Sequence, residues 1–505
     1  GAYYYLALTE YELGHVSEAE AALREAAKLD PKNYWYRDKL ARLYSATGRD
    51  ELAIDIYEGL MKDFPRKTDI YYNMVNLYAK QNRTDKVLET LDSIDAVMGK
   101  TESTALARYD ILSRQDRGEE AFKALENYNR DFSSPQVLTV MGDARMMQYA
   151  DTSALRYYQE ALACDAEFAP AMLGAAEVYR QRRQHDEFFS TLDRFVSAES
   201  VDPQYKSNYL STLFKYLDGH FFQNFRPQID TLVEDCIRCH PTDSSVLGVT
   251  GGYYYGTNRH ERAGELLGTA ASLYPQSFSS TATYIQFLTY TQDWDRLLTE
   301  AEKAYANFPK EPGFLSTISA AHYNKGDYQA VIEDSYRLLR DFDRDSSVVL
   351  SAWSTIGDME HQLGNSKLAY KAYDKALKVN RTYAPVLNNY AYYLSVEGRK
   401  LSKAYNMSKV TVEQEPDNAT YLDTFGWILF LQKKPADAKV FFKRAMLYGG
   451  KESVTILDHY AEVLYALKEY DLAQVYWNLA KARNADGEIP DLEERIERRL
   501  KDIGR

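Results

Sequence analysis

Apolar residues recur at helical spacing along most of the chain and stop at regular intervals. Between residues 33 and 65 two apolar stripes follow one another, the first formed by Leu40, Ala41 and Tyr44 and the second by Ala53, Tyr57 and Leu60. Gly48 separates the stripes, and Pro65 ends the second because proline cannot continue a helix without losing a hydrogen bond. The segment therefore predicts a helix, a turn and a second helix.

This unit repeats with a period of 34 residues. Ala19 and Ala53 are 34 residues apart, and so are Pro31 and Pro65, so two residue types share one period. A fixed period of this length indicates a stack of identical structural units. We predict an all-α, right-handed superhelical solenoid.

One position in the second helix recurs once in each repeat, so its occurrences give the number of units. A small side chain there lets two antiparallel helices approach closely. Along the chain this position is occupied by Ala19, Ala53, Val87, Ala121, Ala154, Phe188, Ile229, Ala263, Leu297, Ala330, Ala369, Ala404, Ala438 and Ala473. The list predicts about fourteen helix-turn-helix units.

Two irregularities divide the predicted array. Phe188 and Ile229 are 41 residues apart, and we assign the seven extra residues to a turn at 220–225; Ala330 and Ala369 are 39 apart. The predicted organisation is an N-terminal array of about six repeats at 1–201, an irregular repeat with an insertion at 202–242, a C-terminal array at 243–488 and a capping helix at 489–505.

The capping helix follows from one apolar stripe, formed by Ile489, Leu492, Ile496, Leu500 and Ile503. Glu494 and Arg498 add a helix-stabilising pair four residues apart. No comparable cap precedes Tyr3, and terminal units of a solenoid need a polar outer face, so we expect the natural chain to begin further upstream.

The repeat resembles the tetratricopeptide repeat. The residues that carry the resemblance are Leu40, Ala41, Tyr44, Gly48, Ala53, Tyr57 and Pro65, with further copies around Gly251 to Pro275 and Trp353 to Ala376. The stretch from Asn388 to Trp427 is similar to tandem repeats of bacterial proteins, many of them attached to the cell envelope. The resemblance implies a groove lined by the first helix of each repeat, a partner protein in that groove, and a periplasmic or envelope location in preference to a cytoplasmic one.

Residues on the first helices but off the apolar stripe are the candidate partner-binding set. In the last three repeats they are Asn388, Tyr392, Asp423, Trp427, Phe430, Asp458, Glu462 and Tyr465. Tryptophan and tyrosine give rigid contact area, and the acids favour a neutral or basic ligand. The alternative for Trp427 and Phe430 is packing against neighbouring repeats.

Composition and charge restrict the partners. The formal net charge is -13, and the isoelectric point is about 5.3. Nucleic-acid affinity comes mainly from Lys and Arg, so nucleic acid is not the expected partner. The mean hydropathy is -0.51, and no apolar run approaches the ~18 residues of a transmembrane helix.

One motif suggests a cofactor. Cys236, Cys239 and His240 fit the spacing for covalent haem attachment, but the repeat places Cys236 at a small core position. His260 and Glu261 lack the second histidine of a zinc protease, because Gly264 stands there. We expect neither cofactor nor metal, and no enzymatic activity.

The sequence thus favours a non-catalytic scaffold that binds extended polypeptide segments. A glycan- or peptidoglycan-binding module is an alternative supported by the groove aromatics, and a c-type haem protein is a further one.

Overall fold

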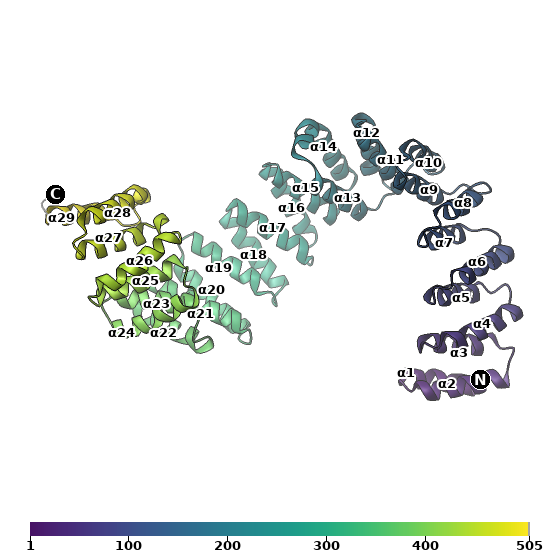
Figure 1. Ribbon diagram of the computed structural model, residues 1–505, viewed down its shortest axis with the longest axis horizontal. Coiled ribbons are helices and arrows are strands. Elements are labelled where there is room, and N and C mark those ends of the chain that lie inside the picture. The colour runs from purple at the N-terminus through teal and green to yellow at the C-terminus, as the bar shows by residue number, and fades with distance from the viewer. Residues whose placement is uncertain (503–505) are drawn as a thin grey trace. The chain divides into compact units, whose positions relative to one another are not determined.

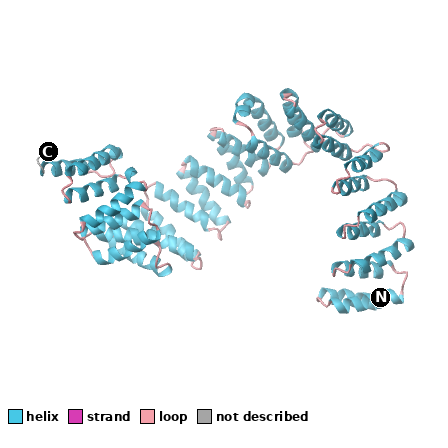
Figure 2. Cartoon of the chain, in the orientation of Figure 1, coloured by secondary structure: helices cyan, strands magenta, loops and turns pink. Residues whose placement is uncertain are grey.

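The computed structural model describes residues 1–502, and all of its regular elements are helices in that range (Figures 1 and 2). The helices form a solenoid of antiparallel pairs, and the chain divides into two compact units, Gly1–Tyr253 and Tyr254–Arg505. The all-α solenoid prediction is confirmed.

From α1 to α28, odd-numbered helices are the first helices of the repeats and even-numbered helices are the second. In the first unit they are α1 Ala2–Glu12, α2 Val16–Leu29, α3 Tyr34–Ala46, α4 Asp50–Asp63, α5 Thr68–Lys80, α6 Thr84–Met98, α7 Glu102–Ser113, α8 Gly118–Asn129, α9 Pro135–Met147, α10 Asp151–Cys164, α11 Ala169–Gln181, α12 His185–Ser197, α13 Pro203–Tyr216 and α14 Gly219–Cys239. The boundary between the units falls within α15, Ser244–Gly256.

The second unit continues the same alternation. Its helices are α16 His260–Leu273, α17 Phe278–Thr291, α18 Trp294–Asn307, α19 Pro312–Asn324, α20 Tyr328–Asp341, α21 Ser346–Gln362, α22 Ser366–Val379, α23 Ala384–Val396, α24 Leu401–Gln414, α25 Ala419–Leu431, α26 Pro435–Leu447, α27 Val454–Ala466, α28 Tyr470–Arg483 and α29 Leu492–Asp502. Two short 3-10 helices, Gly450–Glu452 and Asn484–Asp486, lie in its loops.

The recurring position used to number the repeats, from Ala19 to Ala473, falls once in each second helix, from α2 to α28. Thirteen of the fourteen predicted residues are buried, with at most 1% exposure. Ala330 is the exception: it is half-buried, whereas Val331 beside it is 1% exposed. The predicted register is wrong by one residue in α20, because the N-cap Asp327 sets where this helix begins. Fourteen pairs remain.

Most turns between paired helices contain a left-handed residue. Gly48 has φ of +75°, and Asn82 takes φ of +56° at the equivalent place in the next repeat. Glycine reaches this conformation without steric cost, and asparagine tolerates it better than most residues. This explains why Gly48 interrupts the apolar pattern.

The insertion between Phe188 and Ile229 is helical, so the predicted turn at 220–225 is wrong. These residues begin α14, which is 21 residues long and is kinked at Phe225, two residues before Pro227. Rings from the added segment pack onto α12: the Phe225 ring lies 4.4 Å from the ring of His185. Aromatic burial on the preceding repeat thus supports helical structure where spacing alone suggested a turn.

The second irregularity is also helical. First helix α21 has 17 residues, whereas its neighbours α19 and α23 have 13 each. The four added residues account for the longer interval between Val331 and Ala369.

Helix α29 covers the end of the second unit. Leu492 and Ile496 are buried in a core that also holds Trp477, and Ile489 and Leu500 pack against it. Ile503, the last residue of the predicted stripe, lies outside the described residues.

Candidate partner-binding site

The predicted partner-binding residues lie on three consecutive first helices, α23, α25 and α27. We call the surface carried by α19, α21, α23, α25 and α27 the first-helix face. Four of the eight residues are buried, namely Asn388, Asp423, Asp458 and Glu462. Tyr392, Trp427, Phe430 and Tyr465 are half-buried. Helix α25 contacts both α23 and α27.

His459 of α27 joins two of the predicted residues on α25. Its Nδ1 lies 2.8 Å from a carboxylate oxygen of Asp423. Its ring stacks on Trp427, with 3.9 Å between ring centroids and 13° between planes. Trp427 also contacts Phe430 at 5.1 Å between ring centroids. One face of Trp427 is therefore used inside the protein.

Helix α29 pairs the acids of α27. Arg495 donates to both carboxylate oxygens of Asp458, at 3.1 and 2.7 Å, which is the bidentate geometry of a strong ion pair. Arg499 donates to Glu462 at 2.9 Å and lies 4.9 Å above the ring of Tyr465. Two arginines thus neutralise two buried carboxylates.

The predicted residues of α23 have fewer partners. Asn388 is 4% exposed, and its side-chain oxygen accepts no hydrogen bond within the described chain. Burial raises the pKa of Tyr392, and the charges of Asp423 and Asp458 raise it further. The phenol of Tyr392 therefore stays protonated beside two acids.

A cavity of about 540 Å³ opens on the first-helix face next to these residues. Its polar lining comes mainly from α19, α21 and α23 and includes Ser316, Ser319, Tyr323, Thr355, Asp358, Asn389 and Tyr393. Sequence reasoning placed none of these residues in the site. The signal available was the spacing, since Asp358, Tyr392, Trp427 and Glu462 recur at intervals of 34 or 35 residues.

Asp358 is the charged group of this cavity. The hydroxyl of Tyr373 donates to its Oδ1 at 2.6 Å, and the amide of Asn389 donates to the same oxygen at 3.0 Å. Burial raises the pKa of the carboxyl, while these two donors oppose the rise. Asp358 therefore presents a half-buried carboxylate held by neutral groups.

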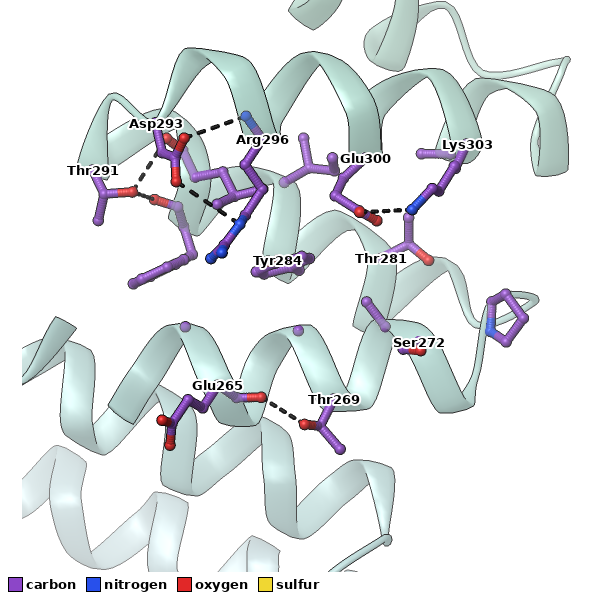
Figure 3. Close-up of a pocket in the computed structure, with 18 of the residues that line it drawn as sticks. Glu265, Thr269, Ser272, Thr281, Tyr284, Thr291, Asp293, Arg296, Glu300 and Lys303 are labelled. Atoms are coloured by element: carbon purple, nitrogen blue, oxygen red, sulfur yellow. Dashed lines mark hydrogen bonds and ion pairs between the residues drawn. The ribbon is translucent and has the colours of Figure 1, made fainter. Parts of the chain in front are cut away.

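A larger cleft, of about 1040 Å³, lies between the second helices α16 and α18 with α17 as its floor (Figure 3). Gly268 makes room for Tyr284, whose ring atoms would lie 3.1 to 3.4 Å from an added methyl group. Glu300 and Lys303 pair with each other at 2.8 Å along one wall. The charges in this cleft are mixed in sign, so they favour no single class of ligand.

The cysteine motif does not fit a covalently bound haem. Cys236 is fully buried, and burial raises its pKa to about 12. Lys206, also fully buried, lies 2.7 Å from Nε2 of His240 and 3.4 Å from the sulfur of Cys239. Haem attachment needs two accessible thiols and a free imidazole nitrogen, whereas these side chains pack against one another.

The same cluster has a structural role. The ammonium of Lys206 donates to the carbonyl of Ala198 at 2.6 Å, and Cys239 contacts the carbonyl of Ser197 at 3.7 Å. Both carbonyls lie at the C-terminal end of α12, where cations and hydrogen-bond donors are favourable. Within residues 1–502, no three His, Cys, Asp or Glu side chains are grouped to hold a metal ion.

Family models for the tetratricopeptide repeat match three segments, residues 1–33, 38–66 and 350–383. The first two fall on the α1–α4 region and the third on α21 and α22. The segments thus include repeats from both units.

Two bacterial proteins share local sequence similarity with the chain. Over 102 residues it is 31% identical to cellulose synthase operon protein C of Pseudomonas fluorescens, covering 20% of this chain and 8% of that protein. Over 115 residues it is 30% identical to the type IV pilus assembly protein PilF of Pseudomonas aeruginosa, covering 22% of this chain and 45% of that one. The match thus spans less than half of either relative.

Among solved structures, a tetratricopeptide repeat protein from Parabacteroides merdae aligns with a TM-score of 0.39 and 14% identity, covering 51% of this chain and 98% of that one. Within residues 1–502, no helix is both long and apolar enough to span a membrane.

Proposed function

Because this chain is a tetratricopeptide-repeat protein, we propose that it is a non-catalytic scaffold that binds an extended segment of a partner protein along the first-helix face. The partner would contact the half-buried members of the predicted set and the adjoining cavity at Asp358. The remaining predicted residues would support that surface from within.

The cavity between α19 and α23 is the observation that carries the proposal. It combines a carboxylate, several hydroxyl groups and the rings of Tyr323 and Tyr393 in one concave place. Binding sites of this kind are concave, with a few polar groups that fix orientation. Tyr392, Trp427 and Phe430 extend the same face with rigid aromatic area that is still partly exposed.

The charge of the chain supports a neutral or basic partner. The net charge of -13 attracts cations and repels acidic surfaces. We place the complex in the bacterial envelope, since one relative is by name a pilus assembly protein and another a cellulose synthase operon protein.

Photo-crosslinking from matched positions tests the scaffold function. Tyr323 on α19 and Tyr336 on α20 are 51% and 50% exposed, but only Tyr323 lines the cavity. With p-benzoyl-phenylalanine at either position in native cells, we expect a discrete protein adduct from position 323 and none from position 336. Equal adducts from both positions, or none from position 323, would contradict the proposal.

A double variant tests the predicted residues. Trp427→Ala with Tyr392→Ala should reduce the adduct from position 323 at least about tenfold, because aromatic anchors carry much of the binding energy of an interface. Circular dichroism must show that the variant is folded. An unchanged adduct in the folded double variant would remove these two residues from the site.

A further inference from the structure

The cavity at Asp358 has one charge and a lining of otherwise neutral groups. Among its lining residues the hydroxyl and amide groups include those of Ser316, Ser319, Thr355 and Gln362, and Asp358 is the only acidic or basic side chain of that lining. A carboxylate in a half-buried place without a cation is under-compensated. A positive charge would complement this carboxylate.

The two oxygens of Asp358 differ in availability. Oδ1 accepts from both Tyr373 and Asn389, whereas in the described chain no donor reaches Oδ2. A guanidinium group binds best when it can donate to both oxygens, as Arg495 does to Asp458. An ammonium group is a compact donor of three hydrogens and needs only one carboxylate oxygen with other acceptors nearby.

The aromatic groups of the cavity suit the same ligand. Tyr323 and Tyr393 both line it, and His361 stacks on Tyr393 with 3.4 Å between centroids. Burial and the charge of Asp358 raise the pKa of Tyr393 to about 12, so its phenol is neutral. Neutral tyrosine rings attract cations through their π faces.

We propose that the cavity formed by Asp358, Tyr323, Tyr393 and the neighbouring hydroxyl groups is a binding site for a primary ammonium group, namely a lysine side chain of the bound segment. The inference rests on the proposed scaffold function and gives its partner a chemical identity. Lysine is preferred to arginine because a single carboxylate oxygen is free.

The first unit supplies a matched control. In α9 the hydroxyl of Tyr158 donates to Asp143 at 2.6 Å, as Tyr373 does to Asp358. Gly174 occupies the place that corresponds to Asn389, and Asp143 is exposed to solvent. Asp143→Asn thus changes the same local bond outside this cavity.

The test uses the full chain labelled with 13C at its methionine methyl groups, because Met359 lines the cavity. The probes are acetyl-Gly-Lys-Gly-amide and its arginine and Nε-acetyl-lysine analogues. We expect the lysine probe to shift the Met359 signal saturably and to bind at least tenfold more tightly than either analogue. Asp358→Asn, which keeps an acceptor for Tyr373 and Asn389, should remove the effect, and Asp143→Asn should retain it.

Several results would overturn the inference. They are equal shifts with the acetylated probe, retention of binding in a folded Asp358→Asn variant, or no shift with any of the probes. A shift with N-acetylglucosamine but not with the lysine probe would assign the cavity to a glycan instead. If the crosslink from position 323 forms while the lysine probe fails, the scaffold function stands and only this inference falls.

Discussion

Asp358 of α21 and Glu462 of α27 occupy equivalent places in two first helices of the same unit, yet they have different neighbours. The following first helix brings the neutral amide of Asn389 to Asp358, at 3.0 Å. At Glu462 the following helix, α29, brings the guanidinium of Arg499, at 2.9 Å. One carboxylate borders a cavity and the other is closed by an ion pair.

The comparison shows that contacts from the next repeat determine whether a side chain on the first-helix face is available to a ligand. The residue at the position fixes where a charge or ring stands, and the following helix decides whether it remains available to a ligand. Trp427, at the equivalent position of α25, is an intermediate case because His459 covers one face of its ring. Available groups are therefore found by considering adjacent repeats together.

Removing the two arginines should produce the largest effect. Arg495→Gln with Arg499→Gln leaves Asp458 and Glu462, which are 4% and 5% exposed, without their cations. Breaking a buried ion pair from one side costs roughly 3–5 kcal/mol, and undocking of α29 limits this cost by letting water reach the acids. We expect the amides of α29 to lose most of their hydrogen-exchange protection while those of α21 keep theirs.

Arg498 provides the control for that variant. It pairs with Glu494 on the same helix, and both side chains are at least 70% exposed. Exposed pairs of this spacing contribute about 0.3–0.5 kcal/mol, so Arg498→Gln should leave the protection of α29 nearly unchanged. Equal loss in the two variants would mean that the protection of α29 does not depend on the buried ion pairs of Arg495 and Arg499.

A change at Gly357, beside the cavity at Asp358, should have a smaller effect. A methyl group there would clash with the Tyr373 ring, so Gly357→Ala must displace the residue that holds Asp358. Overpacking of this kind costs about 1–3 kcal/mol. We expect faster hydrogen exchange in α21 and α22.

Gly252 gives the opposite expectation. It is exposed within α15, and an added methyl group would meet nothing within 4 Å. Gly252→Ala should stabilise its helix by about 0.5–1 kcal/mol, since glycine is a poor helix former. If both substitutions stabilised the chain, the close packing of Tyr373 on Gly357 would be wrong.

The period of the sequence was sufficient to predict the helices and their pairing, because each small or apolar position reports local packing. It failed at 220–225, where the burial of Phe225 on the preceding repeat makes an insertion helical. It also missed Asp358, because the environment of this residue depends on Asn389, which lies 31 residues later on another helix. Side-chain partners across repeats follow from three-dimensional contacts that periodicity does not encode.

The pH dependence of stability is the smallest expected effect, and it distinguishes two aspartates of the second unit. Burial raises the folded-state pKa of Asp358, so its contribution to stability is present below its unfolded pKa of about 3.9 and is lost as the pH rises through the folded pKa. For Asp341, the hydrogen bonds from Arg340 and from Tyr305 lower the pKa to about 2. The contribution of Asp341 is therefore present above about pH 3.9 and is lost as the pH falls through 2.

The two signs can be measured by comparing wild type with Asp358→Asn and with Asp341→Asn at each pH from 3 to 7. Hydrogen exchange of α20–α22 measures local stability without requiring the whole array to unfold in one step. As the pH rises, the stability of the wild type relative to Asp358→Asn should fall. Over the same range, the stability of the wild type relative to Asp341→Asn should increase. His361 of α21 also faces Asp358, and burial lowers its pKa, but it is present in every variant and so cancels at first order. Parallel trends in the two comparisons would mean that burial does not raise the pKa of Asp358 and that its carboxyl is solvated like an ordinary surface carboxylate.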